Sequence, residues 1–176
     1  MAGSNINRLH HAAYVTQDQE ATRHFYEDVI GLPLVATWCE HDDMRGKKRY
    51  YCHTFFSLSD GGALAFFQLA DPADSELFRF RQQEPTLQHI ALNVDAATQA
   101  AIHQRLLEYG TKPESIRITD HGYCISLYTS DPNGIPIEFT CDKSTFDDMA
   151  ERRGVNAHSE LKRWLAGDHT PNKDLG

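Results

Sequence analysis

The chain has 176 residues, of which 40% are hydrophobic and 10% aromatic, which suffices for one packed domain or two small modules sharing a core. Its formal net charge of −8, with both signs interspersed, excludes the basic face that nucleic-acid binding needs. No apolar run approaches the roughly 20 residues of a membrane span, and the first residues lack the apolar segment of a signal peptide. We therefore expect a cytoplasmic protein with neither a nucleic-acid nor a membrane partner.

The first half of the chain predicts a strand, a helix and three further strands. Residues 8–16 alternate in polarity and are rich in β-forming types. Asp18 can cap a helix that runs to about Ile30, and Gly31 suits the left-handed position that ends such a helix. Strand candidates follow at about 33–40, 49–58 and 63–70, the last two separated by a Gly61-Gly62 hairpin. The basic cluster at 45–49 is interpreted as a solvated loop.

The second half repeats this order from Thr86. Residues 87–94 predict a strand, and Asp95 can cap a helix that ends near Gly110. Strand candidates follow at about 115–119, 122–130 and 135–141, with a type I turn signal at Asp131-Pro132-Asn133-Gly134 between the last two. Each copy is therefore β-α-β-β-β, which gives modules at about 6–70 and 86–142 within a domain at 1–143.

Two segments lie outside the repeat. The linker at 71–85 carries Leu77, Phe78 and Phe80, which predicts a short helical segment. Residues 144–176 form a C-terminal extension whose apolar residues suggest one or two amphipathic helices before a polar end. The apolar side of this extension is expected to cover the domain or a dimer partner.

The chain contains four cysteines, Cys39, Cys52, Cys124 and Cys141, and no two of them form a C-x-x-C pair. A zinc knuckle or a thioredoxin-type motif is therefore not indicated. Reduced thiols are expected in a cytosolic setting. Cys52, Cys124 and Cys141 lie in strand-like runs and are interpreted as small core residues.

Three residues that could bind one metal occupy matching places in the repeat: His11, His89 and Glu138. In both copies a Leu lies two residues before the His and an Ala two residues after it. Glu138 lies within the apolar run at 135–139, where an unpaired carboxylate would be costly to bury. Two histidines and one carboxylate with open positions are a ligand set of non-haem Fe(II) oxygenases.

Each of these residues also has a plainer interpretation. His11 and His89 can be ordinary strand residues, and Glu138 can be half of an ion pair. His10 competes with His11 as a ligand, but strand alternation would put it on the opposite face.

The repeat and its motifs resemble the vicinal oxygen chelate superfamily, which includes glyoxalase I, extradiol ring-cleavage dioxygenases, fosfomycin- and bleomycin-resistance proteins and methylmalonyl-CoA epimerase. The motifs that carry the resemblance are Leu9-x-His11 with Asp18, Phe25-Tyr26 before Gly31-Leu32, His89-Ile90-Ala91, and Asp131-Pro132-Asn133-Gly134-x-x-x-Glu138. The resemblance covers about residues 6–142.

The resemblance implies an α+β fold in which two βαβββ modules pair into an open, barrel-like cup around one metal. By position, His11 and His89 would be first-strand ligands and Glu138 a last-strand ligand. The possible fourth position falls at Gln68, a neutral amide where glyoxalases I usually place a ligating residue. The remaining two His and one Glu match the set of extradiol dioxygenases.

A second local match concerns catalysis. Extradiol dioxygenases carry a Tyr ten residues before the Glu ligand, which corresponds to Tyr128, and a His further upstream, near His121 with an offset of two. The His that two-domain dioxygenases place before their second ligand has no counterpart, since residue 74 is Asp74. A turn His and a strand Tyr are the plainer interpretations of His121 and Tyr128.

Three functions follow as hypotheses. The leading one is a one-domain dioxygenase that uses Fe(II) to cleave a catechol-like small molecule. The second is a glyoxalase-like isomerase, lyase or thiol transferase that uses Zn, Ni, Co or Mn and needs no oxygen. The third is a non-enzymatic small-molecule binder of the bleomycin-resistance type. The resemblance also implies a homodimer.

Overall fold

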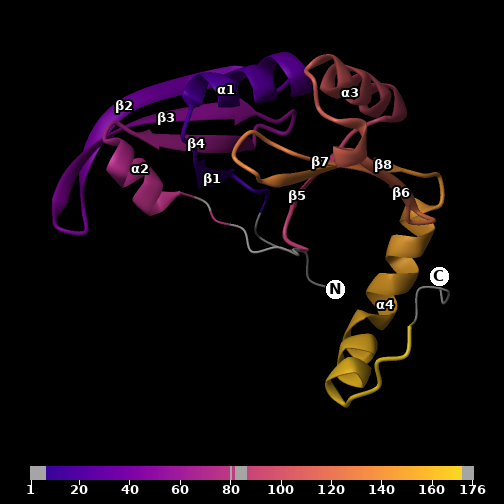
Figure 1. Ribbon diagram of the computed structural model, residues 1–176. Helices are drawn as coiled ribbons and strands as arrows, with labels where there is room; N and C mark the ends of the chain where they lie inside the picture. Colours follow the sequence, from indigo (N-terminus) through magenta and orange to yellow (C-terminus); the bar gives the residue numbers. More distant parts are fainter. Residues whose placement is uncertain (1–6, 80, 82–86, 172–176) are drawn as a thin grey trace.

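Two four-stranded sheets with the same internal strand order form the body of the molecule (Figure 1). The structure is a computed structural model that describes residues 7–79, 81 and 87–171. The first sheet has the order β1-β4-β3-β2, with bounds β1 His11–Val15, β2 Leu34–Met44, β3 Lys47–Ser57 and β4 Ala63–Leu69. The second has the order β5-β8-β7-β6, with bounds β5 Ile90–Asn93, β6 Arg117–Asp120, β7 Cys124–Ser130 and β8 Pro136–Asp142. In each sheet the first strand runs parallel to the last, as a crossover helix requires. The predicted α+β architecture is confirmed.

The helices lie where the sequence pattern places them, with one addition in the connection to β6. Their bounds are α1 Gln19–Arg23, the π-helical η1 His24–Ile30, α2 Pro72–Phe78, α3 Ala96–Glu108, the short 3₁₀ turn η2 Pro113–Ser115, and α4 Phe146–Leu165. Helix α2 confirms the helical linker segment, although Phe80 lies outside the described residues. None of the described helices is both long and apolar enough to cross a bilayer.

The caps of the two repeated helices form as predicted. The Asp18 carboxylate accepts a bond from the Ala21 amide at 3.0 Å, and Asp95 accepts one from Thr98 at 2.7 Å. Gly31 ends η1 with φ of +96°, a conformation that residues with a Cβ rarely adopt.

A π-helical turn absorbs a difference in length between the two copies. The Gln19 amide donates to the carbonyls of Cys52 and Phe66, and Gln99 makes the equivalent bonds in the second module. Between this glutamine and the closing glycine the first module has one residue more. The π-helical stretch η1 accommodates that extra residue, so both helices end at equivalent points of their modules.

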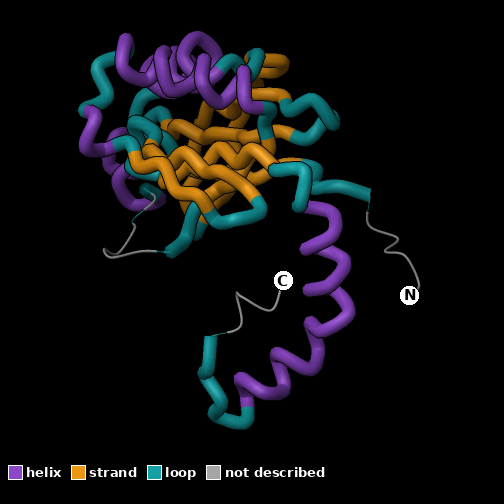
Figure 2. Tube along the Cα trace, turned by 90° about the vertical axis from the view of Figure 1, so that its right-hand side faces the viewer, coloured by secondary structure: helices purple, strands orange, loops and turns teal. Residues whose placement is uncertain are grey.

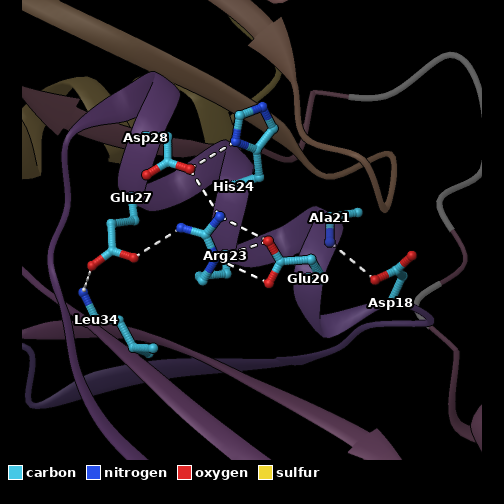
Figure 3. A network of polar contacts seen from close by, with 8 residues as sticks. All are labelled: Asp18, Glu20, Ala21, Arg23, His24, Glu27, Asp28 and Leu34. Carbon is cyan, nitrogen blue, oxygen red and sulfur yellow. Dashed lines mark hydrogen bonds and ion pairs between the residues drawn. The ribbon is translucent and has the colours of Figure 1, made fainter.

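Figure 3 shows a polar network around the junction between α1 and the π-helical η1. The Arg23 guanidinium contacts Glu20 at 2.7 Å, Glu27 at 3.1 Å and Asp28 at 2.9 Å. Asp28 also accepts from His24, and the hydrogen bonds from Arg23 and His24 lower the pKa of Asp28 to about 2. These groups are exposed or partly exposed, so the network orients the helix more than it stabilises the fold.

The main hydrophobic core lies between the helices and the sheets and is shared by both modules. Figures 1 and 2 show η1 and α3 on one side of the sheets, whereas α4 points away on the other side. The fully buried members of this core come from η1, α3 and four strands, and include Tyr26, Phe56, Phe66, Leu106, Leu127 and Phe139. One continuous core therefore fixes the two modules to each other on their helix-covered side.

Polar contacts also cross between the modules at this core. The Tyr26 hydroxyl donates to Asp131 of the second module at 3.1 Å. Arg105 of α3 donates to the carbonyl oxygens of Val29 and Ile30 at the end of η1, the latter at 3.0 Å. Asp131 is 5% exposed, and burial raises the pKa of its carboxyl despite bonds from Asn133.

We expect Tyr26→Phe to lower the free energy of unfolding by about 1–3 kcal/mol, because a buried carboxyl loses one of its donors. Urea unfolding at neutral pH measures this change. Tyr109→Phe, which removes a hydroxyl from a 39% exposed residue, is the matched control. Equal unfolding midpoints for the two variants would show that the Tyr26–Asp131 bond contributes nothing.

The opposite side of both sheets, here called the open face, carries the remaining strand positions. Because strand side chains alternate, the residues paired with each other across a sheet share one face. Ala12 and Tyr14 pack on the helix-side core, so His11 and Ala13 lie on the open face. In the second sheet the same rule puts Ile137 on the helix side and Glu138 on the open face.

The basic cluster differs from its prediction, whereas the C-terminal extension agrees with its prediction in forming a helix. The basic cluster is not a solvated loop throughout: the turn is confined to Arg45 and Gly46, and Arg49 lies in β3, 7% exposed and 2.9 Å from Asp74. The C-terminal extension forms a single helix, α4, none of whose residues is buried. The domain core therefore does not cover its apolar side, where Trp164 is 57% exposed.

Candidate metal centre

Two of the three candidate ligands meet on the open face of the second sheet. His89 immediately precedes β5, and Glu138 lies in β8, the parallel neighbour of that strand. His89 Nε2 is 2.7 Å from Glu138 Oε2. The carboxylate is 6% exposed, whereas the imidazole is about one-third exposed at its outer side. The pair thus faces a pocket that Tyr128, His121 and Asn93 also line.

The hydrogen-bond partners of His89 make this pair suitable for a cation. Its Nδ1 lies 2.7 Å from the carbonyl oxygen of Leu87, which can only accept a hydrogen bond. The proton of a neutral imidazole is therefore on Nδ1, which leaves a lone pair on Nε2 facing the lone pairs of Glu138. Either a proton or a metal ion must lie between them, and backbone-anchored imidazoles of this kind are usual in metal sites.

Neighbouring hydroxyl groups hold Glu138 in its charged form. Tyr128 donates to Glu138 Oε1 at 2.9 Å. Burial raises the pKa of Glu138, whereas hydrogen bonds from Ser126 and Tyr128 lower it, and the pKa lies below its usual range. The carboxylate is therefore available as an anionic ligand at neutral pH.

His121 and Tyr128 lie together, beside the His89–Glu138 pair. His121 Nε2 is 3.0 Å from the Tyr128 hydroxyl oxygen, so a chain of polar contacts runs from His121 through Tyr128 and Glu138 to His89. Burial, followed by the bond to Glu138, raises the pKa of Tyr128, which keeps this phenol protonated at neutral pH. The structure thus brings four of the sequence-predicted residues into one cluster.

Two residues of this cluster were missed by sequence reasoning. The Arg117 guanidinium lies over the Tyr128 ring, 4.0 Å from its centroid, and Ser126 bonds Glu138 from the same face of β7. Arg117 pairs directly with Tyr128 across β6 and β7. Only the register of these strands places both residues at the site, and no local motif signals it.

The third candidate ligand, His11, lies at the start of β1 on the open face of the first sheet. Its Nδ1 is 2.8 Å from His10 Nδ1, so one of these rings donates to the other. His10 was expected on the opposite face, but it precedes the strand, and its ring packs against that of His11. His10 is therefore placed to orient His11.

Aromatic side chains accompany His11 on the open face of the first sheet. His53 stacks on Phe67 with a centroid distance of 3.5 Å, and Trp38 and Phe55 adjoin it. His53 is 8% exposed, and its Nε2 has no hydrogen-bond partner among the described residues. Burial, together with the proximity of His11, lowers the pKa of His53 to about 4, so this imidazole is neutral.

The expectation that His11, His89 and Glu138 meet within one chain is not met. Among the described residues, no three His, Cys, Asp or Glu side chains lie close enough to hold a metal. The shared core fixes the modules by their helix-covered side, and so does not bring the two open faces together. Each chain therefore presents one candidate ligand, His11, on the first sheet and the other two, His89 and Glu138, on the second.

Gln68 is not the fourth position. In the register of β3 and β4, Gln68 pairs with Cys52 and lies on the face opposite His11, where its amide bonds Gln19 and Gln17 at the start of α1. The counterpart of Glu138 is Ala65: Ala65 pairs with Ala13 just as Glu138 pairs with Ala91. Ala13 and Ala91 each lie two residues after a candidate histidine. Ala65 itself is fully buried.

Comparison with known proteins agrees with this architecture. Residues 8–139 match the family model of the glyoxalase/bleomycin resistance protein/dioxygenase superfamily. The chain belongs to this superfamily. An uncharacterized Escherichia coli K12 protein, YaeR, is 23% identical over 133 residues, which covers 76% of this chain and 95% of that protein.

Solved structures of the superfamily share the fold. A glyoxalase/bleomycin resistance protein/dioxygenase domain from Frankia sp. EAN1pec aligns with a TM-score of 0.60 and 13% identity, covering 79% of this chain and all of that one. The fosfomycin resistance protein FosX from Mesorhizobium loti aligns with a TM-score of 0.54 and 19% identity over 82% of this chain and 98% of that one. The oxidase ChaP-H2 aligns with a TM-score of 0.52 and 20% identity, covering 78% of this chain and 94% of that one. FosX from Listeria monocytogenes was solved with Mn(II), so members of the superfamily bind divalent metals.

Proposed function

We propose that this protein is a metal-dependent enzyme whose site holds a divalent cation between His89, Glu138 and His11. The observation that carries the proposal is the 2.7 Å approach of His89 Nε2, whose ring is anchored through Nδ1 to the Leu87 carbonyl, to the Glu138 carboxylate. Neutral imidazole and carboxylate are ligands for Fe(II), Zn, Mn, Co and Ni alike. A bound cation would supply Lewis-acid activation of two vicinal oxygen atoms of a substrate.

The complete ligand set in this proposal comes from two copies of the chain. The open face of the first sheet carries His11, and the open face of the second carries His89 and Glu138. A two-fold dimer that sets the first sheet of one protomer against the second sheet of its partner forms two identical cups. The aromatic side chains around His53 would then form the wall opposite Tyr128.

Within such a cup the residues of this chain supply proton transfer and orientation. Tyr128 stays protonated, and its hydroxyl can donate to a developing oxyanion. His121 contacts the Tyr128 oxygen and can return or accept a proton through it. Arg117, exposed above the Tyr128 ring, adds a positive charge at the entrance and favours a substrate that is anionic when it binds.

Ring cleavage of a catechol-like substrate with Fe(II) and dioxygen is the reaction that this set supports best. Two His and one carboxylate leave positions for two substrate oxygens and for dioxygen, and His121 with Tyr128 supplies the proton relay. The absence of a fourth ligand at Ala65 favours this reaction over a glyoxalase-like isomerisation, for which a fourth ligating residue is usual. The second candidate is a glyoxalase-like isomerase, lyase or thiol transferase reaction without dioxygen, and the Mn(II) bound to the FosX of similar fold supports a metal other than iron.

Metal analysis of protein purified without oxygen or chelator tests this proposal. About one iron per chain, with oxygen uptake on a panel of catechols, is the expected result. About one manganese, zinc, nickel or cobalt without oxygen uptake would instead favour the isomerase, lyase or thiol transferase reactions. A chain that binds no metal after reconstitution would instead be a small-molecule binder.

We expect Tyr128→Phe to lower kcat by about 10²-fold even at saturating metal, because the developing oxyanion loses its donor, and to weaken metal binding by about 10-fold, because Glu138 loses an outer-shell hydrogen bond. Steady-state oxygen uptake measures kcat. Tyr123→Phe, which removes a hydroxyl from the same pocket without contact to Glu138, is the matched control. Full activity in both Tyr128→Phe and His121→Ala would remove these two residues from the mechanism.

A further inference from the structure

A pair of cysteines faces each other across the hairpin of β2 and β3. Cys39 pairs directly with Cys52 in the antiparallel register, so both side chains project from the same face of the first sheet. That face is opposite the one that carries His11, because Cys52 pairs on its other side with Gln68. The thiols therefore lie outside the proposed metal centre.

The spacing of opposed residues suits a covalent link. Directly opposed residues of antiparallel strands have Cα atoms about 4.5 or 5.5 Å apart, and disulfides span about 4.4–6.8 Å between Cα atoms. Both thiols are free in this structure. Burial, followed by the interaction with the neighbouring Cys39 thiol, raises the pKa of the Cys52 thiol.

The pair is open to small molecules. Cys39 is exposed and Cys52 partly exposed, and together they line a surface pocket with His41, Tyr50 and Gln68. This accessibility contradicts the interpretation of Cys52 as a core residue, which holds only for the buried Cys124. Exposed or strained disulfides have higher reduction potentials than structural ones and are readily reversed.

We propose that Cys39 and Cys52 form a reversible disulfide on reaction with a low-molecular-weight disulfide such as oxidised glutathione. The thiolate of Cys39, the more exposed sulfur, attacks the oxidant, forms a mixed disulfide and releases one small thiol. The thiolate of Cys52, its proton lost to solvent, then attacks Cys39 Sγ and releases the second small thiol. Two protein thiols are oxidised and one small disulfide is reduced to two thiols.

The disulfide would link the edge strand β2 to β3, the strand that contacts the start of α1. β2 is the outermost strand of its sheet, and the carbonyl of Cys52 accepts a bond from Gln19 at the start of α1. Closing the short loop between the two cysteines restricts the unfolded chain. The oxidised protein should therefore melt at a temperature roughly 5–10 °C higher than the reduced protein.

Titration with oxidised and reduced glutathione, followed by thiol counting and peptide mapping, tests the proposal on the full-length protein. Free thiols should fall from the four of the chain to two, with one peptide pair linking Cys39 to Cys52, and reduced glutathione should restore all four. Cys39→Ser should abolish the link. Cys141→Ser should not, because Cys141 lies in β8 of the second sheet, away from the β2–β3 hairpin.

Two outcomes would overturn the proposal. One is a stable mixed disulfide of Cys39 with glutathione that never closes onto Cys52, and the other is loss of no thiol at any glutathione ratio. Peptide mapping of the wild-type protein tests the proposal directly, so the result does not depend on how well the serine variants fold. Neither outcome depends on whether the protein binds a metal.

Discussion

Glu138→Gln should abolish most metal binding while the fold stays intact. The amide keeps the shape of the side chain and can still accept from Tyr128 and Ser126, but it removes the negative charge that faces His89. Loss of an outer-shell partner commonly costs 10–100-fold in metal affinity, so loss of the charged ligand itself should cost about 100-fold or more. Competition with a chromophoric chelator measures the affinity, and circular dichroism tests the fold.

Glu151→Gln is the matched control for this substitution, because Glu151 is an exposed residue of α4, remote in sequence from the cluster. The control should bind metal with unchanged affinity. Unaltered affinity in Glu138→Gln as well would refute the role of Glu138 and leave an ion pair with His89 as its function.

Mixed dimers of His11→Ala and His89→Ala should recover activity that neither variant has alone. If each cup takes His11 from one protomer and His89 with Glu138 from the other, the heterodimer holds one intact cup and one doubly impaired cup. We expect each homodimer to be near background and the heterodimer, purified through two different affinity tags, to have about half the wild-type activity. Steady-state turnover and metal content per dimer measure this.

The control pairs two substitutions of the second module, His89→Ala and Glu138→Gln. Each cup of that heterodimer contains one impaired second module, so no recovery is expected. Recovery in the first pair together with its absence in the second is the signature of a shared site. An inactive His11→Ala/His89→Ala heterodimer would place the complete site within one chain and refute the sharing.

The sequence predicted much of the fold because its local signals agree with one another. Asp18 and Asp95 cap their helices and Gly31 ends the first one, so element order and helix starts followed from short-range chemistry. The π-helical turn η1 was not predicted, since the extra residue becomes visible only when the equivalent bonds of Gln19 and Gln99 align the two modules.

The site was predicted less completely, because faces and partners depend on long-range pairing. His89 and Glu138 were placed together by the repeat and the family resemblance, and their side chains are in contact. Gln68 was chosen by position within an apolar run, and a shift of three residues along β4 separates it from the true counterpart, Ala65. Such a shift changes the face of the strand, as any odd shift does.

The location of His11 illustrates a further limit. Matching positions in the sequence repeat predict that His11 and His89 occupy equivalent positions in their modules. They do not predict which open faces meet. That depends on how the modules pack, and here the packing is set by bulky residues such as Tyr26 and Leu106 on the helix-covered side. No motif around His11 contains this information.

The alanine at position 65 has a consequence for charge. With neutral His11 and His89 and a single carboxylate from Glu138, a bound divalent cation would keep one net positive charge, which a second carboxylate in place of Ala65 would cancel. A substrate that loses one proton on binding, as a vicinal diol of low pKa does, would then leave the centre electrically neutral inside a site of low dielectric constant. In the proposed cup, Ala65 would therefore favour a substrate that binds as a monoanion.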